Sequence, residues 1–351
     1  MTAPASTDPA AGASRTASNG RPATIHDVAA LSGVAASTVS RALSTPGRVN
    51  FRTRARIEAA AAQLKYVPNA QAKALSSGRT KAVAVLVADI TNPFYFDIIR
   101  GTQLQLKAAG YTQLLVDTEE SDEVEVNTVE QLRQTADGVI LTASRLSDEA
   151  LAVVAEKMPL VTINRDVAGV PSVVLDTPTA TNQALDHLIS LGHARVAYLG
   201  GPEASSSNIR RWAALSEAAK TRGVEVLRLG PFAPRTYSGA AAADALVHSG
   251  ATAGIAFNDL VAIGMLQRLR ERGVRVPEDM SIVGCDDIFG ADFCSPPLTT
   301  VTAPVEQAGR VAVTMLLSRL AAGQGNLPRN QTVLPTYLTV RGSTGPAPAA
   351  R

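Results

Sequence analysis

Polar side chains gather at the predicted carboxyl ends of several apolar strands. These ends read D-I-T-N-P-F-Y at 89–95, T-A-S at 142–144, N-R-D at 164–166, G-G-P at 200–202, N-D at 258–259 and C-D-D at 285–287. In open α/β sheets, ligands bind beyond the carboxyl ends of the strands. Hydrogen-bonding groups with two aromatic rings in reach, Phe94 and Tyr95, are typical of a site for a small polar ligand.

The sequence lacks the common catalytic signatures. It contains no G-x-x-x-x-G-K-[ST], G-x-G-x-x-G or G-x-S-x-G motif, which would indicate nucleotide binding or a nucleophilic serine. His187 and His193 lie six residues apart in sequence and could form a metal pair, but the L-G-H turn between a helix and a strand favours a structural role. No other group has metal-ligand spacing. We therefore expect no catalytic residue, no metal and no cofactor.

A second set of hydrogen-bonding side chains lies on residues 24–43. Apolar spacing predicts a helix with Ile25, Val28 and Ala29 on its inner face. Gly33 suits the left-handed exit of that helix. A second helix would bury Val39, Ala42 and Leu43, which leaves its polar residues, Ser37, Thr38, Ser40 and Arg41, on or near the outer face. The pattern is that of a helix-turn-helix, whose second helix can enter a DNA major groove; the alternative is two ordinary surface helices.

Charge favours the DNA interpretation. Residues 21–81 carry ten basic and two acidic side chains, a net charge of +8. The whole chain is +2 and the first twenty residues are neutral, so residues 82–351 carry −6. A basic head on an acidic body is the electrostatic signature of a nucleic-acid-binding module joined to another domain.

Two further helices are predicted before the body of the chain. Asn50 can cap a third helix over about 51–64, with Arg52, Arg54 and Arg56 around its first turns. Asn69 can cap a short fourth helix over 70–76. That helix has one large apolar residue, Leu75, and helices of this length are marginal alone.

From residue 82 the chain alternates apolar strands with amphipathic helices. We predict strands at 82–88, 111–116, 138–142, 159–163, 172–175, 194–199, 224–228, 252–257, 280–284 and 331–340. Helices are predicted near 94–109, 122–135, 147–157, 178–191, 208–222, 237–249, 259–272 and 304–322. This alternation indicates parallel sheets with helices on both faces, and its length suits two lobes better than one sheet.

Composition is that of a globular protein. The 351 residues are 46% hydrophobic and 18% charged. The longest apolar runs, such as 82–88, are too short to cross a bilayer. No secretory signal is visible, and the two cysteines are not a disulfide framework. We expect a cytoplasmic protein with no membrane association.

Several motifs resemble the lac-repressor (LacI/GalR) family of bacterial transcription regulators from residue 24 to about 341. They are T-I-H-D-V-A with G-V-A-A-S-T-V-S-R, Y-V-P-N-A-Q-A-K-A-L, D-I-T-N-P-F-Y, L-I-S-L-G-H-A-R-V-A-Y-L-G-G, A-F-N-D, V-P-E-D-M-S-I-V-G-C-D-D and P-P-L-T-T-V. The resemblance implies an N-terminal all-α helix-turn-helix DNA-binding domain, a hinge helix and an α/β two-lobed periplasmic-binding-protein-like effector domain. It also implies a homodimer on a pseudo-palindromic operator in double-stranded DNA.

The expected domains follow from this resemblance and from composition. They are a disordered tail over 1–21, the helix-turn-helix domain over 22–67, the hinge helix and linker over 68–80, the two-lobed effector-binding and dimerisation domain over 81–341, and a disordered tail over 342–351. No leucine heptads follow Arg341, which argues against a coiled-coil tetramer.

The resemblance places base-reading side chains at Ala36, Ser37 and Arg41. Arg41 can donate a bidentate pair to guanine, the alternative being a phosphate contact. Leu75 matches a hinge leucine that wedges into the minor groove, or it packs on its dimer mate. The full predicted DNA-binding set is Thr24, Ala36, Ser37, Thr38, Arg41, Asn50, Asn69, Ala72 and Leu75.

Ligand positions of the family match Arg211, Asn258 and Asp286. Phe94 and Tyr95 could stack on a sugar ring or a base, and Ser144 and Arg165 complete the predicted effector-binding set. The family's usual Asp-Arg pair reads Asn164-Arg165 here. For each of these residues, the alternative is a strand-end residue that ties loops together.

We therefore expect a sequence-specific transcription regulator, a repressor, whose operator affinity is controlled by a small polar effector, a sugar or polyol, bound between two lobes. A purine stays open as the effector, as does a body that senses a phosphocarrier protein or acts without a ligand. A solute-binding protein would need a secretion signal and no basic head. An enzyme would need a nucleophile or acid–base constellation that the sequence does not offer.

Overall fold

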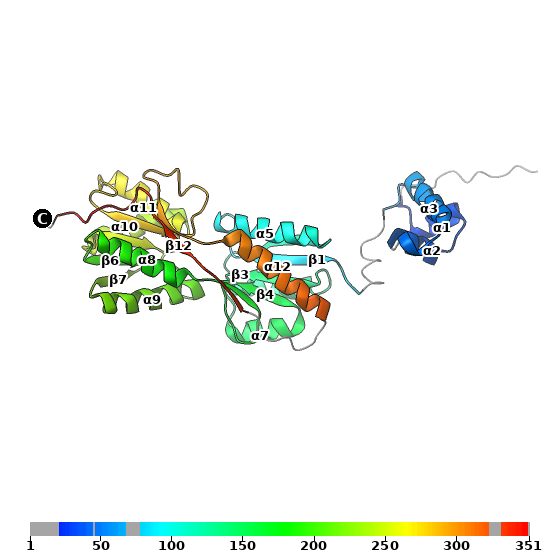
Figure 1. Ribbon diagram of the computed structural model, residues 1–351, viewed down its shortest axis with the longest axis horizontal. Helices are drawn as coiled ribbons and strands as arrows, with labels where there is room; N and C mark the ends of the chain where they lie inside the picture. Colours follow the sequence, from blue (N-terminus) through cyan, green and yellow to red (C-terminus); the bar gives the residue numbers. More distant parts are fainter. Residues whose placement is uncertain (1–20, 45, 68–77, 323–330, 350–351) are drawn as a thin grey trace, which may run out of the picture. The chain divides into compact units, whose positions relative to one another are not determined.

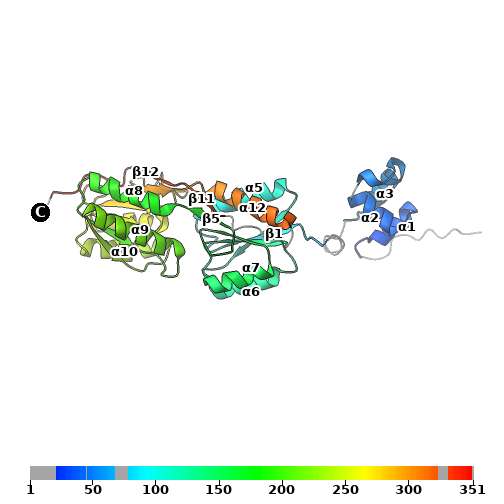
Figure 2. The same ribbon diagram turned by 60° about the horizontal axis from the view of Figure 1, so that its bottom comes forward.

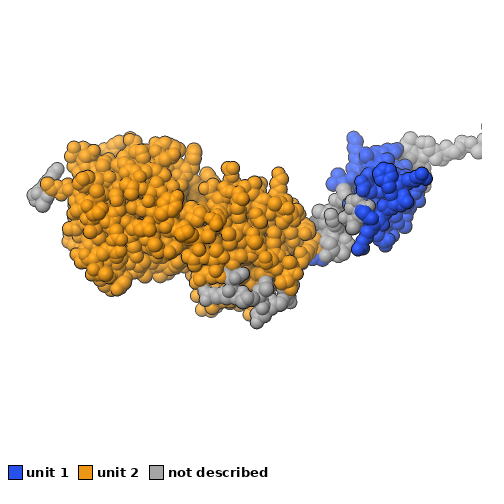
Figure 3. Space-filling model, in the orientation of Figure 1, with its two compact units in different colours: residues 1–78 blue, residues 79–351 orange. Residues whose placement is uncertain are grey.

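The computed structural model describes residues 21–44, 46–67, 78–322 and 331–349. The chain divides into two compact units, residues 1–78 and 79–351 (Figure 3). The second unit contains two lobes, each built on its own six-stranded sheet. In the described part of the chain, no helix is both long enough and apolar enough to span a membrane.

The described part of the first unit is a small helical domain. It contains α1 (Ile25–Ser32), α2 (Ala36–Ser44), the 3-10 turn η1 (Pro46–Arg48) and α3 (Phe51–Gln63). Val28, Val39 and Ile57, one from each α-helix, have no exposed surface and form its core. The inward faces predicted for α1 and α2 are confirmed.

Caps define the ends of these helices. The backbone N–H and the hydroxyl of Thr24 each donate to Oδ2 of Asp27 at 2.8 Å. These bonds cap the N-terminus of α1. Gly33 ends α1 with a φ of 65°, a conformation that costs glycine little. Oδ1 of Asn50 accepts from the backbone N–H of Arg52 at 2.9 Å and caps α3. The helix exit at Gly33 and the cap at Asn50 were predicted from the sequence.

The first lobe is a parallel sheet with helices on both faces. The strand order is β11–β5–β4–β3–β1–β2, with β1 (Ala82–Val87), β2 (Thr112–Asp117), β3 (Gly138–Thr142), β4 (Leu160–Ile163), β5 (Ser172–Leu175) and β11 (Gln331–Leu334). Helices α5 (Phe94–Ala108) and α12 (Val305–Ala322) cover one face, while α6 (Asp122–Leu132) and α7 (Asp148–Lys157) cover the other (Figures 1 and 2). Strand β1 is buried along its whole length, as a parallel strand covered on both faces should be.

The second lobe repeats this arrangement. Its strand order is β12–β10–β9–β8–β6–β7, with β6 (Arg195–Leu199), β7 (Glu225–Leu229), β8 (Ala253–Ala256), β9 (Ser281–Cys285), β10 (Thr299–Thr302) and an antiparallel edge strand β12 (Tyr337–Thr339). Helices α8 (Thr177–Ser190) and α9 (Ser206–Arg222) pack on one face. The 3-10 turn η2 (Thr236–Ser238), α10 (Gly239–His248) and α11 (Asp259–Glu271) lie on the other face.

The chain crosses between the lobes at three places. These are the connections from β5 to α8, from β10 to α12 and from β11 to β12 (Figure 1). The first and third are tied together, because the backbone N–H of Asp176 donates to the carbonyl oxygen of Leu334 at 3.0 Å and the Thr336 hydroxyl donates to the Asp176 carbonyl oxygen at 2.6 Å. Short parallel crossings of this kind form a hinge on which two lobes can close.

The strand–helix alternation was predicted correctly, with two differences. The strand expected over 331–340 is two strands, β11 in the first lobe and β12 in the second, because the chain changes lobes between them. Strand β10 was not predicted. Its Thr299 and Thr300 are fully buried. Their polar groups have partners inside the lobe: the backbone N–H of Thr299 donates to Ser343 Oγ at 2.8 Å, and the Thr300 hydroxyl donates to Asp259 Oδ1 at 2.6 Å.

The expected disordered tail over 342–351 is wrong for residues 342–349. Ser343 is fully buried, and its hydroxyl donates to the carbonyl oxygen of Ile282 at 2.6 Å. The backbone N–H of Gly345 donates to Ser281 Oγ at 3.0 Å. Small polar residues gave the sequence the composition of a tail, but these residues satisfy buried polar groups of the second lobe.

Candidate DNA-binding surface and effector cavity

The outer face of α2 carries the predicted base-reading residues. Ser37 and Arg41 are exposed, whereas Ala36 and Thr38 are half-buried. Arg41 makes no hydrogen bond or ion pair with another residue of the described ranges, so its guanidinium is available to a partner. Its place near the end of α2 is compatible with contact to a base edge or a phosphate.

Two residues of the predicted DNA-binding set also serve as caps. Thr24 is half-buried and its hydroxyl donates to Asp27, while the exposed Asn50 accepts from Arg52. The three predicted hinge contacts, Asn69, Ala72 and Leu75, lie outside the described residues.

A polar cavity lies between the two lobes of the second unit. Its volume is about 40 Å³, which holds only a few water molecules. The lobes must therefore separate to admit a sugar-sized ligand. The cavity is lined by the ends of strands and the loops that follow them: Asn92, Phe94, Tyr95, Glu120, Ala143, Arg145, Asn164, Leu175, Thr177, Ser205, Ser207, Arg211, Pro234, Phe257, Asn258, Cys285, Asp286, Val301 and Ala303.

Arg211 is the cation that the second lobe buries in this cavity. The side chain extends from the first turns of α9, and the residue is 5% exposed. Its Nη1 donates to the carbonyl oxygen of Phe257, and its guanidinium carbon lies 4.9 Å from the centroid of the Phe257 ring. Its Nε has no hydrogen-bond partner among the residues that the structure describes. A buried donor without a partner costs free energy. This nitrogen therefore indicates that a bound ligand supplies an acceptor.

Asp286 supplies the buried carboxyl group. It follows β9 with a φ of 119°, a strained backbone conformation for a residue other than glycine. Burial raises the pKa of Asp286 to about 8, and the Arg211 guanidinium opposes that rise. Strained residues with perturbed pKa values concentrate at functional sites. Two other cavity residues, Ala143 and Asn164, also have positive φ, at 50° and 60°.

Asn258 lines the cavity but already has two structural partners. Its Oδ1 accepts from the backbone N–H of Val261 at 3.0 Å and caps α11. Its Nδ2 donates to the carbonyl oxygen of Pro234 at 3.1 Å. The remaining lone pair of Oδ1 and the second hydrogen of Nδ2 are what it can offer to a ligand.

Phe94 and Tyr95 form the aromatic wall of the cavity. Their ring centroids lie 5.1 Å apart with an interplanar angle of 79°. Tyr95 is 5% exposed, and burial raises the pKa of its hydroxyl above the ordinary range. The hydroxyl therefore stays protonated and can act as a donor.

Ser144 and Arg165 are not among the residues that line the cavity. Ser144 Oγ accepts from the backbone N–H of Leu146 at 3.2 Å. Arg165 donates to the Leu146 carbonyl oxygen at 2.9 Å and to Asp148 Oδ1 at 2.7 Å, so its carboxylate partner is Asp148. Both side chains tie loops of the first lobe together, which was the alternative weighed for them.

Arg145 lines the cavity and was not predicted. It forms an ion pair with Glu120 at 3.4 Å, and the two side chains are 10% and 21% exposed. Its Nη1 also donates to the carbonyl oxygen of Ala143 at 3.2 Å. The sequence signal was the polar end of β3 at 142–144, and the cavity-lining side chain is one residue further along.

Histidines and acidic groups do not form a metal site in the described ranges. His187 Nε2 is 2.9 Å from the Thr344 hydroxyl, and His193 Nδ1 is 2.8 Å from the Thr252 hydroxyl. Burial lowers the pKa of both imidazoles. No group of three or more His, Cys, Asp or Glu among the described residues could hold a metal ion. The structural interpretation of this histidine pair is thus the better one.

Comparisons with known proteins agree with this architecture. Residues 24–69 match the model of the lacI family of bacterial regulatory proteins, and residues 185–344 match a periplasmic binding protein-like domain. The HTH-type transcriptional regulator DegA of Bacillus subtilis (strain 168) is 32% identical over 337 residues, which cover 92% of this chain and 98% of DegA.

Solved structures show the same likeness over both units. The lac repressor dimer bound to operator and the anti-inducer ONPF has a TM-score of 0.82 at 27% identity, covering 93% of this chain and 100% of that one. The transcriptional regulator CelR in complex with cellobiose has a TM-score of 0.68 at 31% identity, covering 92% and 99%. The regulators to which this chain is related are transcription factors and not enzymes. This chain belongs to the lacI family of bacterial regulatory proteins.

Proposed function

We propose that this protein is a transcriptional repressor whose operator affinity is controlled by a small polar effector, a sugar or polyol, bound between the lobes of its second unit. The observation that carries the effector part is the buried Arg211, which is 5% exposed and whose Nε has no acceptor within the described ranges of the chain. A vicinal diol or a carboxylate matches the fork of a guanidinium.

The donor set of the cavity favours a carbohydrate. Arg211 supplies donors, Asp286 supplies acceptors when ionised, and Phe94 and Tyr95 supply apolar ring surface. This combination suits a ring whose faces are apolar and whose edge carries hydroxyl groups. CelR, a relative in structure, is complexed with cellobiose. A purine would also stack on the aromatic wall, which makes nucleobases the second class to test.

Lobe closure supplies the coupling in this proposal. An effector that prefers one lobe arrangement shifts the population of that arrangement by its difference in affinity for the two. Residues 68–80 join the two units in sequence, and the resemblance assigns Asn69, Ala72 and Leu75 there to the operator. Leu75→Ala should then keep the fold and lose most operator affinity.

A homodimer is the proposed assembly. Phe289 and Phe293 are 79% and 65% exposed, and their ring centroids lie 5.1 Å apart. Phe96 of the first lobe is 49% exposed and borders a depression of about 390 Å³ together with Phe289. An exposed aromatic cluster that spans two lobes is typical of a protein–protein interface. The lac repressor, to which the chain is similar, was solved as a dimer.

Two measurements test this function. Fluorescence anisotropy at physiological ionic strength should show tight binding to promoter fragments of the genes that the protein regulates. Binding to unrelated DNA should be at least about a thousandfold weaker. Thermal-shift screening against sugars, polyols and nucleobases should identify an effector, which should then change operator affinity. Equal affinity for every fragment, with or without each metabolite, would reject the proposal. A phosphocarrier-sensing or ligand-free regulator would bind operator but respond to no metabolite.

A further inference from the structure

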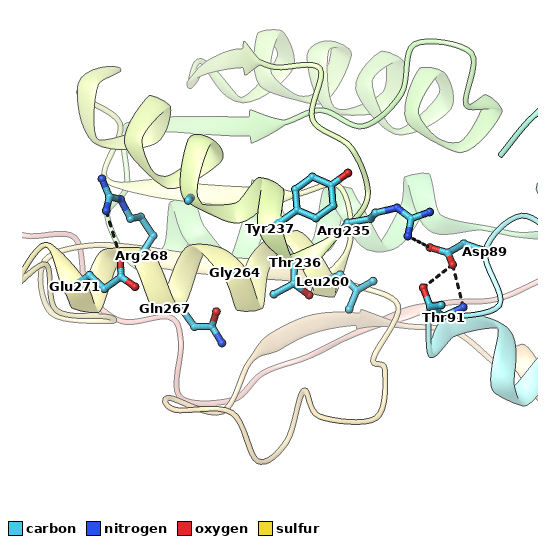
Figure 4. Close-up of a pocket in the computed structure, with 11 residues that line it drawn as sticks. Asp89, Thr91, Arg235, Thr236, Tyr237, Leu260, Gly264, Gln267, Arg268 and Glu271 are labelled. Atoms are coloured by element: carbon cyan, nitrogen blue, oxygen red, sulfur yellow. Dashed lines mark hydrogen bonds and ion pairs between the residues drawn. The ribbon is translucent and has the colours of Figure 1, made fainter. Parts of the chain in front are cut away.

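An ion pair joins the two lobes at the rim of the cavity. Arg235, in the loop between β7 and η2 of the second lobe, places Nη1 3.2 Å from Oδ2 of Asp89, which follows β1 in the first lobe. Figure 4 shows the two side chains meeting, with Thr91 on the far side of the carboxylate. The Asp89 side chain is 5% exposed and that of Arg235 is 39% exposed.

Each lobe anchors its own member of the pair, Asp89 through its carboxylate and Arg235 through its loop backbone. Asp89 Oδ1 accepts from the backbone N–H and the hydroxyl of Thr91, at 2.9 and 2.6 Å. The loop that carries Arg235 is anchored one residue earlier, where the Pro234 carbonyl oxygen accepts from Asn258 Nδ2. The Asp89 carboxylate is therefore positioned before the pair forms, and the backbone that carries Arg235 is anchored, which reduces the entropy lost when the pair forms.

The pair separates two spaces. On its inner side, Asn92 and Pro234 line the small cavity of about 40 Å³. On its outer side, Asp89 and Arg235 border an open depression of about 570 Å³, which Tyr237 and Gln267 also line (Figure 4). A hydrogen bond of 3.1 Å from the Asn92 backbone N–H to the Asp89 carbonyl oxygen links the pair to the cavity wall. Separating the lobes must break this ion pair.

We propose that the Asp89–Arg235 ion pair is a latch that holds the lobes closed over the cavity and sets the balance between the closed and open lobe arrangements. Its consequence for regulation rests on the proposed function, because a latch on closure determines how much effector binding can shift the lobes. Removing the latch enlarges the open population and speeds the entry of the effector. The pair lies at the rim of the cavity. The latch therefore acts without contacting Arg211 and Asp286, the residues proposed to bind the effector.

The test measures lobe separation without DNA or effector. Spin labels are attached to the full chain at Glu156→Cys on α7 and Glu217→Cys on α9, with Cys294→Ser to remove the more accessible native thiol. Both label sites are exposed, and Cys285 is 2% exposed. The labelled chain is mixed with an excess of unlabelled protein, so that a dimer carries at most one labelled chain, and double electron–electron resonance then gives the distribution of distances between the lobes.

The expected result is a threefold to tenfold rise, as an order of magnitude, in the ratio of long to short distances for Asp89→Asn and for Arg235→Gln. The double variant should match the single ones, because each substitution removes the same interaction. Raising the salt concentration from about 0.05 M to about 0.5 M should open the parent protein but not Arg235→Gln, since salt screens half-exposed charges.

The matched control is Arg275→Gln, which removes a pair with Asp279 of 2.7 Å inside the second lobe. It should leave the distances unchanged. The latch is rejected if Arg235→Gln keeps the parent distribution, if Arg275→Gln opens the lobes as much, or if the two single effects add. Arg235→Gln does not touch the Asp89–Thr91 turn, so the test survives a folding defect in Asp89→Asn. A protein that fails to bind operator but opens as predicted would overturn the proposed function and keep the latch.

Discussion

The guanidinium of Arg211 lies over the ring of Phe257 and donates to the backbone carbonyl oxygen of the same residue. One residue thus fixes the arginine twice, through its ring and through its backbone. Because Phe257 follows β8, the strand positions the guanidinium against the cavity before any ligand arrives. Such preorganisation reduces the entropy that a ligand must overcome on binding.

Replacing this arginine should remove the effector response and spare operator binding. Arg211→Lys keeps the positive charge but loses the planar fork, and we expect effector affinity to fall by about 2–4 kcal/mol. Isothermal titration with the effector found by screening measures this loss, and anisotropy checks the operator affinity. The control is Arg210→Ala, the neighbouring arginine, which does not line the cavity. A normal response to the effector in Arg211→Lys would show that this side chain does not bind the effector.

Asp286 should make stability depend on pH. Its pKa in the folded state is about 8, against an ordinary value of 3.8. Between these values the folded state binds more protons than the unfolded state, so the free energy of unfolding falls as pH rises from about 4 to about 8. In Asp286→Asn this contribution is absent. The melting temperature of the parent, relative to that of Asp286→Asn, should therefore fall by roughly 5 °C or more over that range.

Calorimetry of both proteins from about pH 4 to about pH 8.5 measures the difference. The raised pKa of Asp259, which is about 6, affects both proteins and largely cancels. A melting-temperature difference that stays constant across the range would show that Asp286 is ionised throughout and that its burial is compensated.

Arg41 and Arg52 should affect DNA binding differently. If Arg41 contacts a guanine, Arg41→Ala costs about 1–3 kcal/mol on the cognate operator and relaxes specificity at one base pair. Arg52, exposed on the first turn of α3, suits a phosphate. Arg52→Ala should weaken binding to all sequences alike and reduce the slope of log affinity against log salt by about 1.

Anisotropy titrations on the operator and on single-base variants, at several salt concentrations, separate these two effects. Each variant is the control for the other. Uniform weakening by Arg41→Ala, with no change in base preference, would assign Arg41 to the phosphate backbone.

The aromatic cluster should hold the dimer together. Phe289→Ser with Phe293→Ser removes two exposed rings that touch each other, and hot-spot aromatics typically contribute about 2 kcal/mol or more each. We expect the dimer dissociation constant to rise by about 100-fold or more. Light scattering coupled to size exclusion measures the change. Val153→Ser, at an exposed apolar site of α7, should leave the dimer intact. A dimer that survives the double substitution would place the interface elsewhere.

Local patterns were sufficient for much of the architecture. The spacing of Val28, Val39 and Ile57, the caps at Thr24 and Asn50, and the alternation of strands and helices all depend on residues close together in sequence. Period and capping are properties of a few consecutive residues, so they can be read without a structure. The clustering of the polar strand ends could be predicted in the same way, because parallel strands place their carboxyl ends at one edge of the sheet.

Tertiary packing decided which of those polar residues face the cavity. Arg145 lines it, while Ser144, its neighbour, and Arg165 bind other loops of the first lobe. The order of residues 342–349 and the pairing of Asp89 with Arg235 also join positions far apart in sequence. A side chain at a strand end can turn toward several neighbours at similar local cost, so only the arrangement of the surrounding elements selects its partner.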